Sequence, residues 1–282
     1  MLKQRVITAL LLLALFLPAL FASVAWPFMV LTLLLLMAGA WEWGRLNGLS
    51  FGVSLAGALV WGGACGLLLQ TGWALEPHRS LWWFAGSFWV LLGAWMLRRG
   101  VQGWAEWPVL LRWLGGLVLL ALAWLAMVQA HAMGVNFLLS VLVLVWAADV
   151  FAYFAGRALG GRWFPVRLAP AISPGKSWEG VVGGMVGVLL VAWLWTLADR
   201  HWSMPVPSLF SSLFMQGAFV GIPALLLLCA MSVVGDLVES LVKRSAGCKD
   251  SSGLLPGHGG VLDRVDALLP TLPLAMMLVS WF

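Results

Sequence analysis

The densest group of charged side chains lies between residues 236 and 266, in a chain that is otherwise mostly apolar. Only 10% of the 282 residues are Asp, Glu, Lys or Arg. Because charges beside apolar segments of membrane-spanning length are costly to place, this region is predicted to be a working site. Its charged and titratable residues are Asp236, Glu239, Lys243, Arg244, Lys249, Asp250, His258, Asp263, Arg264 and Asp266.

The first part of this region has the pattern of a helix with one charged face. Polar residues recur at the period of an α-helix, between apolar neighbours. Asp236, Glu239, Ser240 and Lys243 are therefore predicted to share one face. Gly247 is a suitable end for this helix.

A glycine-rich segment and a second pair of carboxylates follow. Its glycines, including Gly259 and Gly260, let the backbone turn tightly and approach a ligand closely. Asp263 and Asp266 are three residues apart at the start of the last apolar segment, so a helix would place them on one face. The sequence thus predicts two helix-borne carboxylate pairs around one loop.

Carboxylate pairs beside Lys and Arg are typical of sites that transfer phosphoryl or nucleotidyl groups. Oxygen ligands without Cys or several His select hard cations such as Mg²⁺. Cys65, Cys229 and Cys248 have no paired spacing, so neither a disulfide framework nor a Cys-based metal site is expected.

Two features upstream could also act on phosphate. Asp149 lies inside an apolar segment, about 12 Å from its basic end at Arg157. A carboxylate at such depth indicates a function, unless Arg157 only neutralises it. Lys176 and Ser177 stand where the next helix is expected to begin, and backbone N–H groups at a helix start bind phosphate.

The elements that must position these residues are apolar segments. The chain is 62% hydrophobic, and its apolar runs of about 20 residues match the thickness of a bilayer. We therefore predict an all-α, polytopic transmembrane protein with about nine spans. The expected spans are 6–25, 27–42, 51–70, 80–97, 109–128, 135–156, 178–198, 213–235 and 265–282.

Basic residues predict the orientation of these spans. With a cytoplasmic N-terminus, only Arg79 and Arg200 of the 16 Lys and Arg residues fall on the outer side. We therefore expect an uncleaved first span, a multi-pass protein of the inner (plasma) membrane, and an active site that faces the cytoplasm. The basic residues form no clustered stripe, so no nucleic acid partner is expected.

The chain divides into two regions of different character. Residues 1–134 are predicted to be a transmembrane scaffold, and residues 135–282 a transmembrane catalytic region with cytoplasmic loops 157–177 and 236–264. Within the scaffold, the acidic residues stand near span ends and are expected to be solvated. They are Glu42, Glu76 and Glu106.

Glycines at helical spacing follow Ser177 and predict close contact with another helix. The same small-residue face is compatible with a homodimer. These residues are Gly180, Gly183, Gly184 and Gly187.

The polar region resembles the signature of the phosphatidate cytidylyltransferases, also called CDP-diacylglycerol synthases, without a departure. The stretches 149–157 and 173–180 are similar to two looser features of the same family. The signature residues are Ser240, Val242, Lys243, Arg244, Lys249, Asp250, Ser252, Leu255, Pro256, His258, Gly259, Gly260, Val261, Asp263, Arg264, Val265 and Asp266.

The resemblance implies an integral membrane enzyme that transfers CMP from CTP to phosphatidic acid, with Mg²⁺, and yields CDP-diacylglycerol and pyrophosphate. For the metal it implies Asp236, Glu239, Asp263 and Asp266. For substrate phosphates it implies Lys176, Lys243, Arg244, Lys249 and Arg264, with Asp149, Ser177, Ser240, Gly259 and Gly260 also at the substrate. Asp250 and His258 would orient the substrate or contact the nucleotide.

Two alternatives stay open beside this interpretation. A CTP-dependent polyprenol or phytol kinase could use similar machinery on a lipid alcohol, but it would release CDP instead of pyrophosphate. A membrane transporter is the other alternative, because intramembrane carboxylates and glycine-rich helices also suit transport.

Overall fold

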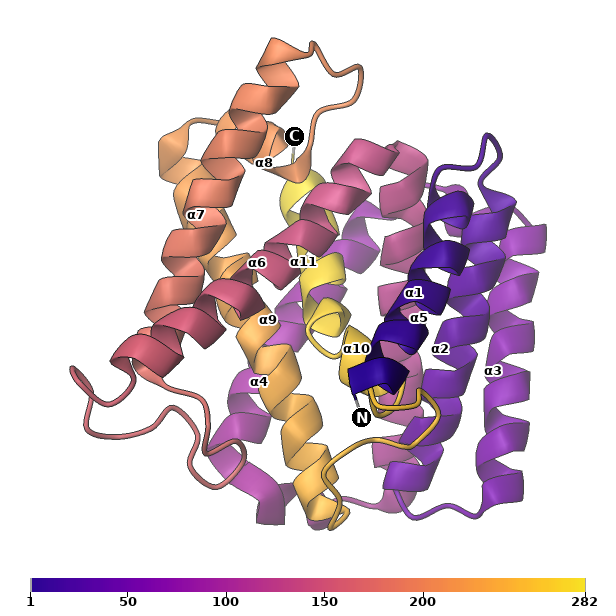
Figure 1. The fold of residues 1–282 in the computed structure, drawn as a ribbon. Coiled ribbons are helices and arrows are strands. Elements are labelled where there is room, and N and C mark those ends of the chain that lie inside the picture. The colour runs from indigo at the N-terminus through magenta and orange to yellow at the C-terminus, as the bar shows by residue number, and fades with distance from the viewer. Residues whose placement is uncertain (1, 282) are drawn as a thin grey trace.

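The computed structural model describes residues 2–281, and this part of the chain is helical without a β-strand (Figure 1). The all-α prediction is therefore confirmed. The elements are α1 Leu2–Leu20, α2 Trp26–Leu46, α3 Phe51–Gln70, the 3₁₀ turn η1 Trp73–Leu75, α4 Arg79–Ala105, α5 Val109–Met133, α6 Val135–Leu159, α7 Trp178–His201, α8 Leu209–Phe214, α9 Ala218–Ser245, α10 Leu262–Val265 and α11 Leu268–Val279.

Seven of these helices are long and apolar enough to cross a membrane, namely α2 to α7 and α9. The apolar part of α1 that was compared, Gln4–Leu20, is shorter than these seven helices, and α11 has only 12 residues. A count of nine spans is therefore not confirmed, although α1 and α11 occupy the places of the first and last predicted spans.

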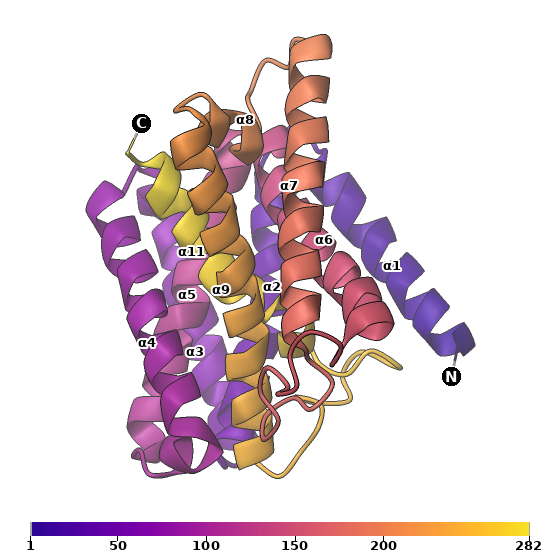
Figure 2. The same cartoon turned by 90° about the vertical axis from the view of Figure 1, so that its left-hand side faces the viewer.

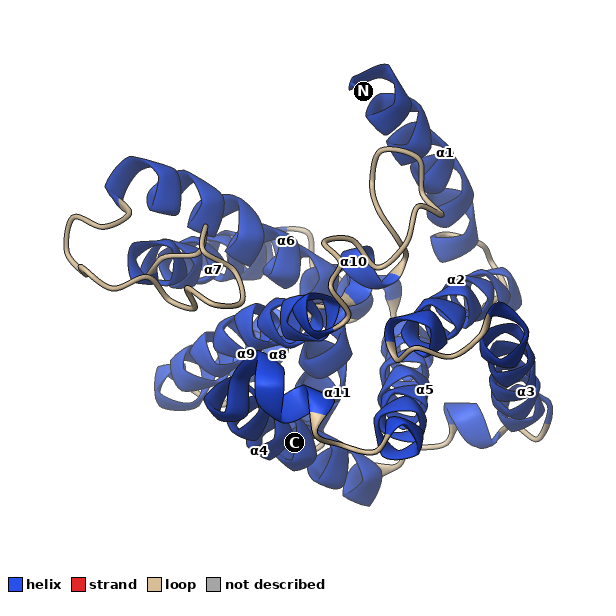
Figure 3. Cartoon of the chain, turned by 90° about the horizontal axis from the view of Figure 1, so that it is seen from below, coloured by secondary structure: helices blue, strands red, loops and turns tan. Residues whose placement is uncertain are grey.

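Helix α11 lies near the centre of the bundle and contacts α4, α5 and α9 (Figure 3). Helices α2 and α3 pair on one side, and α6 and α7 pair on the other. Helix α1 stands at the edge and contacts α2. The core is made of apolar side chains, among them the fully buried Trp82, Trp89 and Trp124.

The glycine-rich face of α7 packs on α6 of the same chain. A Cβ atom on Gly180 would lie 3.0 Å from the carbonyl oxygen of Ala152, and one on Gly184 would lie 2.9 Å from that of Ala148. Only glycine allows so close an approach, so the predicted helix contact is confirmed. Because α6 covers this face, a homodimer would need another surface and stays a prediction.

The two longest loops lie at the same end of the bundle (Figure 2). One joins α6 to α7 over residues 160–177, and the other joins α9 to α10 over residues 246–261. The polar region 236–266 therefore comprises the last turns of α9, the second loop, α10 and the residue that follows it. This arrangement brings two loops that are distant in sequence to one site.

Candidate active site

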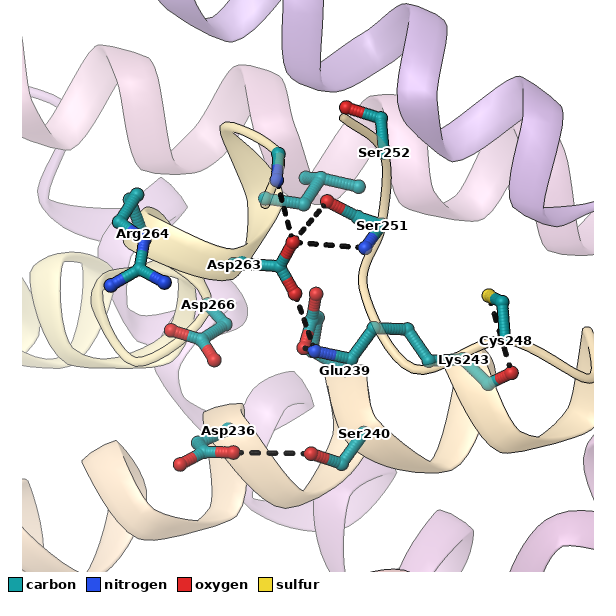
Figure 4. A network of polar contacts seen from close by, with 12 residues as sticks. Asp236, Glu239, Ser240, Lys243, Cys248, Ser251, Ser252, Asp263, Arg264 and Asp266 are labelled. Carbon is teal, nitrogen blue, oxygen red and sulfur yellow. Dashed lines mark hydrogen bonds and ion pairs between the residues drawn. The ribbon is translucent and has the colours of Figure 1, made fainter. Parts of the chain in front are cut away.

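Lys243 is the centre of a buried ion-pair cluster between α9 and α10. Its Nζ lies 2.5 Å from Oδ1 of Asp263 and also contacts Glu239, one turn earlier on α9 (Figure 4). The Lys243, Glu239 and Asp263 side chains are only 12%, 4% and 7% exposed. Beyond this ion pair, neither Glu239 oxygen has a hydrogen-bond donor among the described residues. One ammonium group thus neutralises two buried carboxylates.

The second oxygen of Asp263 is held by the loop that precedes α10. Its Oδ2 accepts hydrogen bonds from the backbone N–H groups of Gly260 (2.7 Å) and Ser251 (2.9 Å) and from the Ser251 hydroxyl (2.8 Å). Burial raises the pKa of Asp263, but these donors and Lys243 outweigh it and lower the pKa to about 2. Asp263 is therefore a fixed negative charge at neutral pH.

The glycines of this loop permit the arrangement around Asp263. Gly259 has a φ of +80°, and a Cβ atom there would lie 2.6 Å from Oδ2 of Asp263. A side chain at Gly260 would collide with the Ser251 hydroxyl and the Glu42 carboxylate. Gly259 and Gly260 thus allow the loop backbone to lie close to the carboxylates, where a side chain would not fit.

A second group of polar residues surrounds a cavity beside α6, α7 and α9. The cavity has a volume of about 360 Å³, and its lining includes Asp149, Lys176, Ser177 and Asp236. Lys176 Nζ lies 2.6 Å from Oδ2 of Asp236, and this ion pair ties the first long loop to α9. The structure therefore has a cavity at Asp149.

The alternative partner for Asp149 is engaged elsewhere. Arg157 donates a hydrogen bond to the hydroxyl of Tyr153 (3.0 Å). The described residues form three ion pairs, and none of them includes Asp149. Neutralisation by Arg157 is therefore not what the structure shows.

The carboxylates of Asp236 and Asp266 offer oxygen ligands near the Lys243 cluster (Figure 4). Asp236 also accepts a hydrogen bond from Ser240 (3.2 Å), and Asp266 accepts one from the N–H of Ala267 (2.8 Å). In the described part of the chain, no three Asp, Glu, His or Cys side chains are arranged to enclose a metal. This donor set still suits Mg²⁺, which usually takes one or two carboxylates and completes its shell with water and substrate phosphates.

The remaining predicted residues differ in how the structure engages them. Ser177 caps α7, because its hydroxyl accepts the N–H of Gly180 (3.1 Å). Arg244 contacts the carbonyl oxygens of Ile172 and Cys248 from the end of α9. Lys176 and Ser177 thus stand at a helix start, as predicted.

Two residues of the second loop, Lys249 and Asp250, were predicted to contact the substrate. In the structure, both residues are exposed to solvent. Arg264 donates two hydrogen bonds to the carbonyl oxygen of His258, at 2.8 and 3.1 Å, and so closes the turn before α10. Nδ1 of His258 is buried and has no hydrogen-bond partner among the described residues.

The expectation that Glu42 is solvated is wrong. Its side chain is fully buried, and its carboxylate accepts hydrogen bonds from the second loop and from the start of α10. Because Glu42 is close to the end of a predicted span, we expected water to reach it. In the structure, the loop that follows α9 folds over this end of α2 and supplies the hydrogen-bond donors. Sequence periodicity carries no signal for such a contact.

A second buried carboxylate that the sequence reasoning did not single out is Glu179 on α7. Its Oε1 accepts hydrogen bonds from the N–H groups of Gly161 (2.9 Å), Trp163 (3.0 Å) and Phe164 (3.1 Å). Glu179 therefore holds the first long loop against the start of α7.

Comparison with known proteins shows the family of this chain. Residues 3–282 match the sequence profile of the cytidylyltransferase family. The chain belongs to this family. It is 36% identical to phosphatidate cytidylyltransferases of Haemophilus influenzae and of Pseudomonas aeruginosa, over 97% of the chain and 96% and 95% of those proteins. A phosphatidate cytidylyltransferase of Brucella abortus is 39% identical over 66% of the chain and 59% of its own length.

Proposed function

We propose that this protein transfers CMP from CTP to phosphatidic acid and forms CDP-diacylglycerol and pyrophosphate. The observation that carries the proposal is similarity to phosphatidate cytidylyltransferases over nearly the whole length of both chains. The geometry is in keeping with it, because Asp149, Lys176 and Asp236 line a cavity beside apolar helices, and Lys243 forms its ion pairs near Asp236.

In the proposed reaction, a phosphate oxygen of phosphatidic acid attacks the α-phosphorus of CTP. The new P–O bond forms as the bond from that phosphorus to the oxygen bridging to the β-phosphate breaks, and pyrophosphate leaves with this electron pair. A phosphomonoester is largely ionised at neutral pH because its second pKa is about 6, so no strong general base is required. The protein must mainly align the phosphates and offset their charge.

The residues of the site suit these tasks. Lys176 at the cavity and Lys243 beside Asp263 would attract substrate phosphates, and the cap of α7 at Ser177 would orient them. Asp236 and Asp266 would hold Mg²⁺. When bound, this ion would offset the charge that builds up on the phosphates in the transition state.

An apolar cavity of about 290 Å³ lies on another side of the same site. Its lining includes Glu239 and Leu262 together with Trp43, Trp89 and Trp104. An aromatic and aliphatic lining next to the ion-pair cluster suits the acyl chains of a lipid better than a nucleotide. This feature supports a lipid as one of the two substrates.

One assay tests the proposed function. Purified protein in detergent, with CTP, phosphatidic acid and Mg²⁺, is expected to release one pyrophosphate for each CDP-diacylglycerol formed. Release of CDP from CTP with a lipid alcohol would instead indicate a lipid kinase. Absence of turnover with either lipid would contradict an enzymatic role.

Lys176 is expected to contribute to substrate binding. Lys176→Ala should raise KM for CTP or phosphatidic acid about tenfold, the equivalent of about 1.4 kcal/mol, because a charged phosphate contact is lost. Steady-state kinetics with each substrate varied in turn would measure this. Arg162→Ala, which removes an exposed cation from the same loop, is the matched control. Unchanged KM values for both substrates would leave Lys176 its ion pair with Asp236 and a role in membrane orientation, without a role in substrate binding.

We also propose that both long loops face the cytoplasm in the inner membrane, where CTP is available. In a protein with Cys248 replaced by Ser, Leu254→Cys should react with a membrane-impermeant thiol reagent in inverted vesicles only. Leu254 is 49% exposed in the second loop, and Met204, 41% exposed between α7 and α8, serves as the control for the opposite end. Reaction of Leu254→Cys from the outer side would reverse the proposed orientation.

A further inference from the structure

Glu42 is a fully buried carboxylate to which no Lys, Arg or His side chain is paired among the described residues. It lies on α2, one turn before the end of that helix, and its side chain is 0% exposed. Burial of a carboxylate without hydrogen-bond donors or a counter-charge is very costly, so its neutral donors must account for its presence.

These donors come from the middle of the second loop and from its junction with α10. On one side, the hydroxyl of Ser252 donates to Oε1 at 2.5 Å, and the hydroxyl of Ser251 lies 3.3 Å from Oε2. On the other side, the backbone N–H of Val261 donates to Oε1 at 3.0 Å, and that of Leu262 donates to Oε2 at 2.8 Å. Glu42 therefore connects the two ends of the segment 252–261.

The same segments carry the donors that hold Asp263. Ser251 and Gly260, which donate to Oδ2 of Asp263, are each next to a residue bound by Glu42. The Ser251 hydroxyl contacts both carboxylates and has one proton, which the 2.8 Å contact to Asp263 takes in preference to the 3.3 Å contact to Glu42. Glu42 thus acts on Asp263 through Ser252, Val261 and Leu262 more than through Ser251.

We propose that Glu42 is a positioning residue of the active site, which fixes the second loop so that Asp263 and Lys243 keep their geometry. It touches neither of these side chains by a hydrogen bond, so its effect on the reaction is indirect. The proposal rests on the proposed function for its turnover measurement and on the structure alone for its loop measurement. Small shifts in such supporting contacts typically cost 10- to 100-fold in activity.

The first measurement is turnover of Glu42→Gln. A glutamine keeps the shape of the Glu42 side chain, but its NH₂ group faces N–H and O–H donors. Some of the hydrogen bonds that Glu42 accepts from the loop are therefore lost. We expect kcat to fall about 10- to 100-fold while KM for CTP and for phosphatidic acid change less than about threefold. Glu42→Asp keeps the charge and should recover a large part of the loss. Glu106→Gln, the same change at an exposed carboxylate, should leave both constants unchanged.

The second measurement is amide hydrogen exchange and does not depend on the activity. In Glu42→Gln, exchange in residues 251–262 should become about tenfold faster or more, because the protecting acceptor of Val261 and Leu262 is weakened. The loop of residues 160–177 should keep its rate. Glu179→Gln offers the reverse control: it should speed exchange at Gly161, Trp163 and Phe164 and leave residues 251–262 unchanged.

The outcomes separate the possible failures. Unchanged kcat in Glu42→Gln overturns the positioning role, whatever the exchange rates. Faster exchange throughout the bundle also overturns it, because Glu42 would then support the fold in general. No turnover by the unaltered protein would end the proposed function, and the exchange pattern would still decide whether Glu42 holds the loop.

Discussion

Replacing Asp263 with asparagine is expected to lower turnover by at least about 100-fold with little loss of folded protein. Asp263 joins Lys243 to the loop, and its carboxylate is ionised at neutral pH because its donors lower its pKa to about 2. Asparagine removes this charge and turns an NH₂ group toward Lys243 or toward the N–H groups of Ser251 and Gly260. The fold should persist because Glu239 still pairs with Lys243.

Asp199 provides a matched control for this substitution. It is also buried, and it accepts hydrogen bonds from Asn136, Ser208 and Ser211 at the other end of α7. Asp199→Asn should therefore affect stability without a change in turnover per folded molecule. Pyrophosphate release and size-exclusion profiles of both variants measure the contrast. Normal turnover in Asp263→Asn would remove this residue from the reaction.

Features that depend on a single helix could be predicted from the sequence. Seven of the nine predicted spans correspond to helices long and apolar enough to cross a membrane, as the match between apolar length and bilayer thickness indicated. The shared face of Asp236, Glu239, Ser240 and Lys243 follows from the helical period, and the structure shows the contacts between Asp236 and Ser240 and between Glu239 and Lys243. The start of a helix at Ser177 was likewise predicted, and in the structure the Ser177 side chain caps α7.

Contacts between segments could not be predicted in this way. Glu42 and its donors are separated by 209 to 220 positions, and hydropathy near a span end suggested water. Lys243 was expected to bind phosphate, yet in the structure it pairs with two carboxylates, one of which comes from another helix. Periodicity places a side chain on a face, but it does not say which loop folds over that face.

The pairing of Lys243 leads to the largest expected effect on stability. Lys243→Met would leave Glu239 and Asp263 buried without their cation, and removal of one partner from a buried pair costs about 3 kcal/mol or more in free energy of unfolding. Denaturation in lipid–detergent micelles, followed by tryptophan fluorescence, measures this loss. Turnover should fall as well, because no ammonium remains beside Asp263.

A double variant shows whether the loss comes from the unpaired charge. Among the described residues, Glu239 has no hydrogen-bond donor besides this ion pair, so Glu239→Gln in the Lys243→Met background removes the more poorly compensated of the two carboxylates. It should restore about 1 kcal/mol or more of the free energy of unfolding, whereas Asp263 keeps its three donors from the loop. Equal stability of the single and double variants would mean that Glu239 takes up a proton when Lys243 is lost. Recovery of stability without recovery of turnover would mean that the Lys243 ammonium acts on the substrate as well as on the fold.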